Sequence, residues 1–383
     1  MSHVTQDKWI KLRKQYPITE NKVYLKNASI SGMHSKVIKR SHEWNHSIAC
    51  EGAVNEQRFG DLVFAARDTV AHYLNIPNVE SVTLTENTSH NFNLLAIMLK
   101  EQFPKGAHIL APADEFPSSI LPFYHHGHHI TQFSSHQGVI DEDEFINQIT
   151  DQTHVVICSH VQFSTGFRID IERIARECEK RGVYFFLNAT QSIGVFPIDL
   201  EKLKVTALSA TCHKWLGAGM GRAVFYLNRE FMKEHNPPLL GWCSVAEPFE
   251  MKNTPGVARE DLGIYQLGTL PFTQLAAVKE ALEVNLEIGR EEIETRILQL
   301  ANILRSEINE LGLPIVGAQR SENQSGIITF DPQCNPDDLI EFLEERRIYV
   351  NNRRGLIRAS IHFYNNEEDI NLFISALKDF KHR

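Results

Sequence analysis

Short apolar segments rich in β-branched residues alternate with helical patterns through most of the 383-residue chain. Between these segments, residues 90–100 and 171–182 repeat apolar positions at helical spacing, and Gly182 marks the end of the second helix. Strands that alternate with helices predict a largely parallel sheet with helices on both faces. The segments that we expect to form buried strands are residues 81–85, 108–113, 154–161, 183–189, 207–211 and 222–227.

The pattern changes near Pro271. Residues 271–312 form one long helical pattern, in which we expect a break at Gly289 and an end at Gly312. A helix opened by Asn335 and Pro336 follows later in the chain. The remaining elements are strands at 325–330, 347–350 and 355–361 and a last helix from about Asn366.

This change of pattern predicts three parts. Residues 26–270 would form a large domain that holds the parallel sheet. Residues 271–383 would form a small α+β C-terminal domain, and residues 1–25 an N-terminal segment that packs on it.

Composition narrows the classes of function. The formal net charge of −9 argues against nucleic-acid binding, which needs a clustered basic face. No apolar run reaches the ~18 residues of a membrane-spanning helix, and the first residues lack the apolar core of a signal peptide. The six cysteines contain no C-x-x-C pair, which is typical of thiols in a reducing compartment. We therefore expect a cytoplasmic protein without membrane or nucleic-acid partners.

Polar residues gather where the predicted strands end. Thr88, Asn188, Gln191 and Lys214 follow strands whose carboxyl ends would share one edge, where open α/β sheets bind ligands. Taken alone, each motif is weak evidence. The segment "TENTSHN" (85–91) predicts either a phosphate-binding helix start or a plain N-cap, and the aromatic ring of "DEFPSS" (114–119) either faces a ligand or belongs to the core.

The ordered set of motifs is more specific than any one of them. The segments "ENTSHNFNLLA", "ADEFPSSILPF", "SHVQFSTGFRID", "LNATQSIGVFPIDL", "ATCHKWLGAGMG", "YQLGTLPFTQLAA" and "IRASIHFYNNEEDI" together resemble the class V aminotransferase family from about Tyr24 to Ile370. This family of pyridoxal 5'-phosphate (PLP) enzymes includes cysteine desulfurases and isopenicillin-N-epimerase-like proteins. The resemblance implies the α/β fold type I of PLP-dependent transferases, with a mostly parallel seven-stranded sheet, a small α+β C-terminal domain and a homodimer.

The resemblance also implies a cofactor site. Lys214 would form the Schiff base with PLP and move the α-proton of the substrate, for which its pKa must lie near neutrality. The ring of Phe116 would stack on the pyridine, at a position where desulfurases carry histidine. The phosphate-binding positions match Asn87, Thr88, Thr211 and His213.

Four further positions complete the implied site. Gln191 matches the residue that contacts the phenolic oxygen of the cofactor, and Gln162 would replace a family asparagine with the same partner. Thr269 matches a residue that reaches the phosphate of a neighbouring subunit. Arg358 matches the arginine that binds the substrate α-carboxylate, a task suited to a bidentate guanidinium.

A further departure from the family pattern removes a charge. Asn188 stands where the family has an aspartate, whose charge keeps the pyridine nitrogen protonated. Asparagine supplies no charge, so we expect a weaker electron sink. Three explanations for asparagine at this position stay open: a reaction that needs only a modest electron sink, an engineered substitution, or a loss of catalysis.

These observations predict a PLP-dependent enzyme that acts on an amino acid by transamination, epimerisation or elimination and is isopenicillin-N-epimerase-like. A cysteine desulfurase needs a nucleophilic cysteine on the loop shortly before the arginine that binds the carboxylate. Residues 349–356 form this loop and contain no cysteine, and Cys334 lies before the helix that Asn335 opens. We therefore expect that the enzyme is not a Cys-dependent desulfurase. The alternative, supported only by Asn188, is a PLP-binding protein with a regulatory or assembly role. For the histidines of "HHGHH" (125–129) we expect no functional metal, because no carboxylate or cysteine completes a site.

Overall fold

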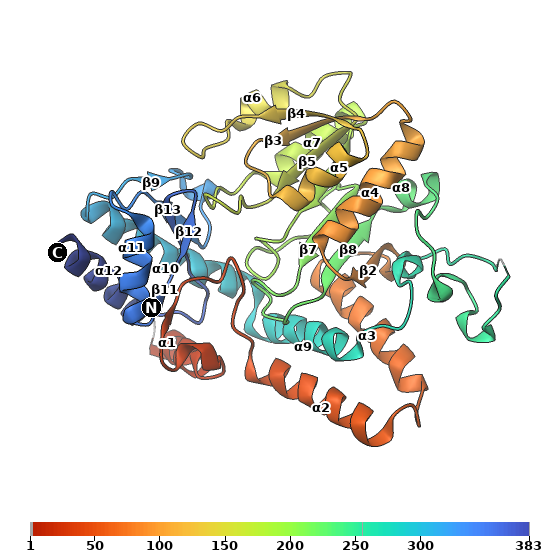
Figure 1. The fold of residues 1–383 in the computed structure, drawn as a ribbon, viewed down its shortest axis with the longest axis horizontal. Coiled ribbons are helices and arrows are strands. Elements are labelled where there is room, and N and C mark those ends of the chain that lie inside the picture. The colour runs from red at the N-terminus through yellow and green to blue at the C-terminus, as the bar shows by residue number, and fades with distance from the viewer. Residues whose placement is uncertain (1–2, 255, 383) are drawn as a thin grey trace.

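The computed structural model describes residues 3–254 and 256–382 and is built around a seven-stranded sheet (Figure 1). The strands lie in the order β2-β8-β7-β6-β5-β3-β4. Only β8 runs antiparallel to its neighbours, so the prediction of a mostly parallel seven-stranded sheet is confirmed. The strands span Val82–Thr85 (β2), His108–Pro112 (β3), His129–Phe133 (β4), Val155–Ser159 (β5), Tyr184–Asn188 (β6), Ala207–Thr211 (β7) and Ala223–Leu227 (β8).

Helices cover both faces of this sheet because successive strand residues point to opposite sides. Val156 of β5 belongs to one apolar cluster, whereas its neighbours Val155 and Ile157 belong to the other. The first cluster includes side chains of α3 (Gln57–Tyr73), α6 (Glu142–Asn147), α7 (Ile171–Arg181) and α9 (Phe272–Ile288), and α2 (Ser35–Glu51) packs along α9. The second includes side chains of α4 (Thr88–Gln102), α5 (Leu121–His125) and α8 (Arg229–Glu234).

The C-terminal part has a core of its own. Its four-stranded antiparallel sheet has the order β12-β13-β10-β9, and β11 pairs in parallel with β1 near the N-terminus. Its elements are α10 (Arg290–Glu310), β9 (Ile315–Val316), β10 (Ile327–Phe330), α11 (Pro336–Glu345), β11 (Ile348–Tyr349), β12 (Asn351–Arg353), β13 (Leu356–Ser360) and α12 (Glu367–Lys381), with β1 at Val23–Tyr24 and α1 at His3–Arg13.

The long helical pattern breaks at Gly289, as the sequence predicts, between α9 and α10. Gly289 has a φ of 99°, a conformation that favours glycine. Helix α9 lies with the large sheet, whereas α10 contributes to the C-terminal core. The division into residues 1–25, 26–270 and 271–383 stays a prediction. None of the described helices is both long and apolar enough to cross a membrane.

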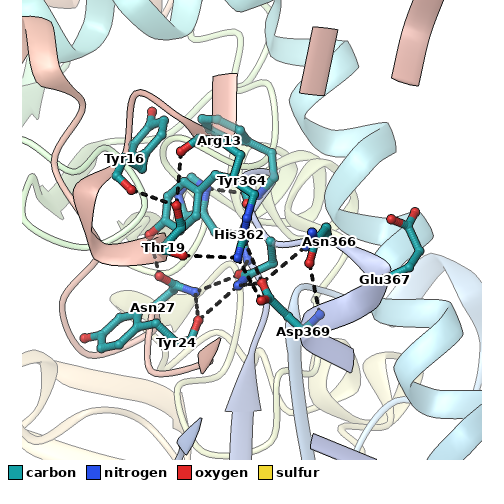
Figure 2. A network of polar contacts seen from close by, with 12 residues as sticks. Arg13, Tyr16, Thr19, Tyr24, Asn27, His362, Tyr364, Asn366, Glu367 and Asp369 are labelled. Carbon is teal, nitrogen blue, oxygen red and sulfur yellow. Dashed lines mark hydrogen bonds and ion pairs between the residues drawn. The ribbon is translucent and has the colours of Figure 1, made fainter. Parts of the chain in front are cut away.

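A polar network ties the N-terminal segment to the C-terminal part (Figure 2). Arg13 of α1 forms a two-pronged ion pair with Asp369 of α12, at 2.8 and 2.9 Å. The Asn27 amide donates to the carbonyl of Ser360 at 2.8 Å, and its Oδ1 accepts from the hydroxyl of Tyr364 at 2.6 Å. These bonds hold the loop after β1 against β13, and this loop leads directly to the candidate site.

We expect Tyr364→Phe to destabilise the protein. The buried Tyr364 hydroxyl donates to Asn27 and accepts from the N–H of Gly32 at 3.0 Å, so its loss leaves two buried polar groups unpaired. The free energy of unfolding should fall by about 2 kcal/mol. Urea denaturation measures this, with Tyr24→Phe as the matched control, because the Tyr24 hydroxyl lies in an exposed bond to Ile30. Equal effects of the two changes would contradict the importance of the buried network.

Candidate active site

A cavity of about 160 Å³ lies beyond the carboxyl ends of β5, β6 and β7, at the first residues of α4. This is the edge at which the sequence placed a ligand crevice. Parallel strands bring their ends together there although they are far apart along the chain. The residues that line the cavity are Asn87, Thr88, Phe116, Ser159, Phe163, Asn188, Thr190, Gln191, Thr211, His213 and Lys214. Ser159, Phe163 and Thr190 were not predicted as site residues, although Ser159 lies near the end of the predicted strand 154–161 and could have been found by that rule.

Lys214 follows β7 and is half-buried at the cavity wall. Its Nζ lies 5.5 Å from the centroid of the Phe116 ring. Burial lowers the pKa of the Lys214 amine to about 7, with further contributions from the positive charges of Arg358 and Arg353. A neutral, nucleophilic amine is therefore available near neutral pH.

The first turn of α4 offers donors for an anion. The Asn87 side chain caps the helix by accepting from the N–H of His90 at 2.9 Å, which leaves the N–H groups at Thr88 and Ser89 directed outwards from the helix start. Across the cavity, the Thr211 hydroxyl bonds to Nδ1 of His213 at 2.9 Å. Burial and the charge of Lys214 lower the pKa of His213 to about 4, so this ring is neutral at pH 7.

Asn188 ends β6, and both sides of its carboxamide have partners. Its Nδ2 donates to the hydroxyl of Ser119 at 2.8 Å, and its Oδ1 accepts from the N–H of Thr190 at 3.0 Å. These two bonds fix the amide plane at the cavity wall. The position therefore carries an oriented dipole and no charge.

Of the two glutamines expected to contact the cofactor, Gln191 lines the cavity and Gln162 does not. Gln191 lines the cavity, with its Oε1 accepting from the indole N–H of Trp215 at 2.8 Å and its Nε2 donating to the carbonyl of Ala28 at 3.0 Å. Gln162 is buried outside the lining, and its Nε2 donates to Oε1 of Glu115 at 2.9 Å. The structure thus does not bring Gln162 to the cavity.

Glu115 is a buried carboxylate that sequence reasoning missed. Besides Gln162, it accepts from the N–H and the hydroxyl of Ser159, the latter at 2.6 Å. Burial raises the pKa of Glu115, and these hydrogen bonds oppose the rise. Its place next to Phe116 in "DEFPSS" was the available signal, since the same turn positions both side chains.

Arg358 of β13 lies at the junction of the two cores and is 1% exposed. Its Nη1 donates to the carbonyl of Phe163 at 2.6 Å, and its Nη2 donates to the Ser29 hydroxyl at 2.9 Å and to Oδ1 of Asn351 at 3.0 Å. Burial and the charge of Arg353 lower the pKa of the guanidinium to about 9. All of these partners are neutral, so the positive charge of Arg358 has no ion-pair partner in the described part of the chain.

Thr269 lies apart from this cavity and is exposed.

In the "HHGHH" segment, His128 is buried, and both of its ring nitrogens bond to backbone groups. Its Nδ1 accepts from the N–H of Ala107 at 3.0 Å, and its Nε2 lies 2.9 Å from the carbonyl of Ala96. His128 thus stabilises the turn before β4.

The residues around the cavity fit pyridoxal phosphate. A lysine amine of lowered pKa, helix N–H donors with the Thr88 and Thr211 hydroxyls for a phosphate, and a Phe116 ring for an aromatic face are present together. A polar amide, Asn188, stands at the carboxyl end of β6 for a ring nitrogen. The donor set therefore suits the group that the sequence resemblance implies.

Comparison with known proteins agrees with this fit. The profile of the Aminotransferase class-V family matches residues 23–373. A probable cysteine desulfurase of Pyrococcus abyssi is 26% identical, with 96% of each chain covered. Among solved structures, the cysteine desulfurase of Thermococcus onnurineus superposes with a TM-score of 0.88 at 22% identity, covering 97% of each chain. A cystine C-S lyase solved with its product cysteine persulfide gives a TM-score of 0.87 at 23% identity, covering 95% of this chain and 99% of that one.

These relatives correct one expectation. The prediction of an isopenicillin-N-epimerase-like enzyme that is not a Cys-dependent desulfurase is wrong, because the relatives matched over nearly the whole chain include probable cysteine desulfurases. The prediction rested on the lack of cysteine in residues 349–356. That lack concerns only one possible sulfur acceptor.

We expect PLP to attach to Lys214 at a rate that follows the ionisation of this amine. Because only the neutral amine attacks, loading of the cofactor-free protein should speed up with rising pH and level off above about pH 7. Absorbance after mixing with PLP measures the rate, and borohydride should then fix the label on the peptide that contains Lys214. A free alkylamine with an ordinary pKa near 10.5 is the control, since its rate keeps rising over this range. Label on another lysine would refute the assignment.

We expect Asn188→Asp to speed proton removal from the substrate α-carbon. The Ser119 hydroxyl can rotate to donate to a carboxylate and the Thr190 N–H still donates, so the geometry is kept. A negative charge raises the pKa of a facing ring nitrogen by ~1–3 units, which corresponds to roughly a tenfold or larger gain. Exchange of the α-proton in D₂O, followed by NMR, measures the effect, and Asn188→Ala should slow it. Slower exchange in the aspartate variant would mean that the reaction favours a neutral partner.

Proposed function

Because the chain belongs to the class-V aminotransferase family and is a PLP-dependent enzyme, we propose that it breaks the carbon–sulfur bond of cysteine or a cysteine derivative. The observation that carries this proposal is the Lys214 amine of lowered pKa at the cavity, together with the buried guanidinium of Arg358, which lacks an ion-pair partner among the described residues and bonds to the carbonyl of the cavity residue Phe163. The desulfurase relatives support sulfur as the leaving atom.

Arg358 and Lys214 would have different roles in this reaction. Arg358 would hold the α-carboxylate in a bidentate pair and so orient the substrate. Lys214 would take the proton from the α-carbon. The electron pair of the Cβ–S bond would leave with the sulfur as sulfide, which gives pyruvate and ammonium after hydrolysis of 2-aminoacrylate. Where an external thiol takes the sulfur instead, the pair would stay on Cβ, and alanine forms after protonation. Bound PLP would supply the electron sink for the charge that develops at the α-carbon.

Among the residues around the cavity, Lys214 would carry the proton, because its neighbours Phe116 and His213 cannot do so near neutral pH. Phe116 offers a flat apolar face but no proton. His213 has a pKa of about 4 and therefore holds no exchangeable charge near neutrality. Helix α4 would fix the phosphate through Thr88 and its first N–H groups, with Asn188 and Gln191 positioned along the ring. A single group that titrates near pH 7 is sufficient for both proton removal and return.

We also propose that the enzyme is a homodimer. Thr269 is exposed and outside its own cavity, which supports a role at a neighbouring site. The same part of the chain exposes Leu240, Trp242, Phe249 and Val257, an apolar surface that a second copy could cover.

We further propose a cytosolic location, which the free thiols of all six cysteines support.

Incubation of the PLP-loaded enzyme with L-cysteine and a reducing thiol tests the function. We expect sulfide to be released together with an equal amount of alanine or of pyruvate and ammonium. Lys214→Ala should release no sulfide above the rate of free PLP. A loaded wild-type enzyme that racemises or transaminates amino acids but releases no sulfur from cysteine or its derivatives would overturn the proposal.

A further inference from the structure

Two arginines meet at one neutral hydroxyl beside the active site. The Ser29 Oγ accepts from Nη2 of Arg358 at 2.9 Å and from Nη2 of Arg353 at 3.4 Å. Ser29 in turn donates to Oδ1 of Asn351 at 2.9 Å. The sequence singled out Arg358 alone, because Arg353 lies in the short strand β12 that the apolar pattern does not predict.

The charges at this point are not balanced by the protein. The positive charges of Arg353 and Arg358 both act on Lys214 and both lower its pKa. Among residues 3–254 and 256–382, no carboxylate forms an ion pair with any of these three cations. Arg353 is half-buried, and its other bond is to the carbonyl of Asn352 at 3.0 Å. Gathering cations away from solvent is costly unless an anion joins them.

The neighbouring Arg354 provides a contrast. It is exposed and pairs with Asp114 of the large sheet at 3.4 Å, so it links the β12–β13 turn to the residues before Phe116. Asp114 is already occupied by this pair and by the hydroxyl of Ser135. The turn thus has one arginine with a protein partner and one, Arg353, that faces only neutral oxygen atoms.

We propose that Arg353 binds a second acidic group of the substrate, carried on or next to its sulfur, while Arg358 binds the α-carboxylate. This inference rests on the proposed function and names its substrate class: a cysteine derivative with a second acid on its sulfur, such as an S-sulfonate. Because both guanidiniums reach the same Ser29 oxygen, the two acids must lie only a few bonds apart in the substrate.

The reaction of S-sulfocysteine balances without a further reagent. Lys214 takes the α-proton, the Cβ–S bond breaks and thiosulfate leaves with the bonding electron pair. The remaining 2-aminoacrylate takes up water and gives pyruvate and ammonium. Arg353 would neutralise the charge on the departing sulfur group, which makes it a substrate-binding residue with a role in specificity.

Binding of two small anions tests the site without turnover. Calorimetry on the PLP-loaded enzyme would compare 3-sulfopropanoate, which has two acids, with propanoate, which has one. We expect the diacid to bind at least tenfold more tightly to the wild type and to Arg354→Gln, and the ratio to fall to about one in Arg353→Gln. Arg353→Lys, which keeps the charge, should restore part of the preference. A wild-type enzyme without the preference, or a preference kept in Arg353→Gln, would overturn the inference.

Turnover separates this inference from the proposed function. We expect kcat/KM for S-sulfocysteine to exceed that for L-cysteine at least tenfold in the wild type and in Arg354→Gln, but not in Arg353→Gln. Tight diacid binding without sulfur release from any cysteine derivative would overturn the proposed function and leave the role of Arg353 standing. Sulfur release from cysteine with no diacid preference would overturn only the role of Arg353. If Arg353→Gln does not fold, the wild-type preference and the lysine variant decide.

Discussion

Three basic side chains, Lys214, Arg353 and Arg358, converge at the junction of the two cores without a carboxylate of their own among the described residues. This constraint governs the site. Burial, together with repulsion from the two guanidiniums, lowers the pKa of Lys214 to about 7, and Arg358 is held by neutral acceptors. The carboxylate of an entering amino acid would therefore meet a positive charge that is already in place.

The fold holds these cations by contacts that are remote from the chemistry. The bond from Tyr364 to Asn27 and the pair between Arg13 and Asp369 fasten the loop after β1 to the C-terminal part (Figure 2). That loop supplies the Ala28 carbonyl to Gln191 and the Ser29 hydroxyl to Arg358. The N-terminal segment therefore acts as a structural part of the site, since its loop connects side chains of both cores.

The rest of the cavity is notable for neutral groups. Asn188, Phe116 and the uncharged ring of His213 stand around the amine of Lys214. None of them can supply or accept a charge readily near pH 7. The chemistry that this chain performs must then depend on the lysine, on the anions that the arginines bind and on the cofactor.

The local sequence alone determined most of the strands and helices along the chain, the break at Gly289 and the polar residues at the strand ends, because hydrophobic period and glycine conformation are local properties. Eight of the site residues named from local pattern or from the family resemblance line one cavity: Asn87, Thr88, Phe116, Asn188, Gln191, Thr211, His213 and Lys214. Tertiary structure decided that Gln162 turns to the buried Glu115, that Thr269 stays outside, and that Arg353 meets Arg358 at Ser29. These outcomes depend on contacts between residues more than 40 positions apart, as between Glu115 and Gln162. Packing and charge balance select such contacts, and no sequence period encodes them.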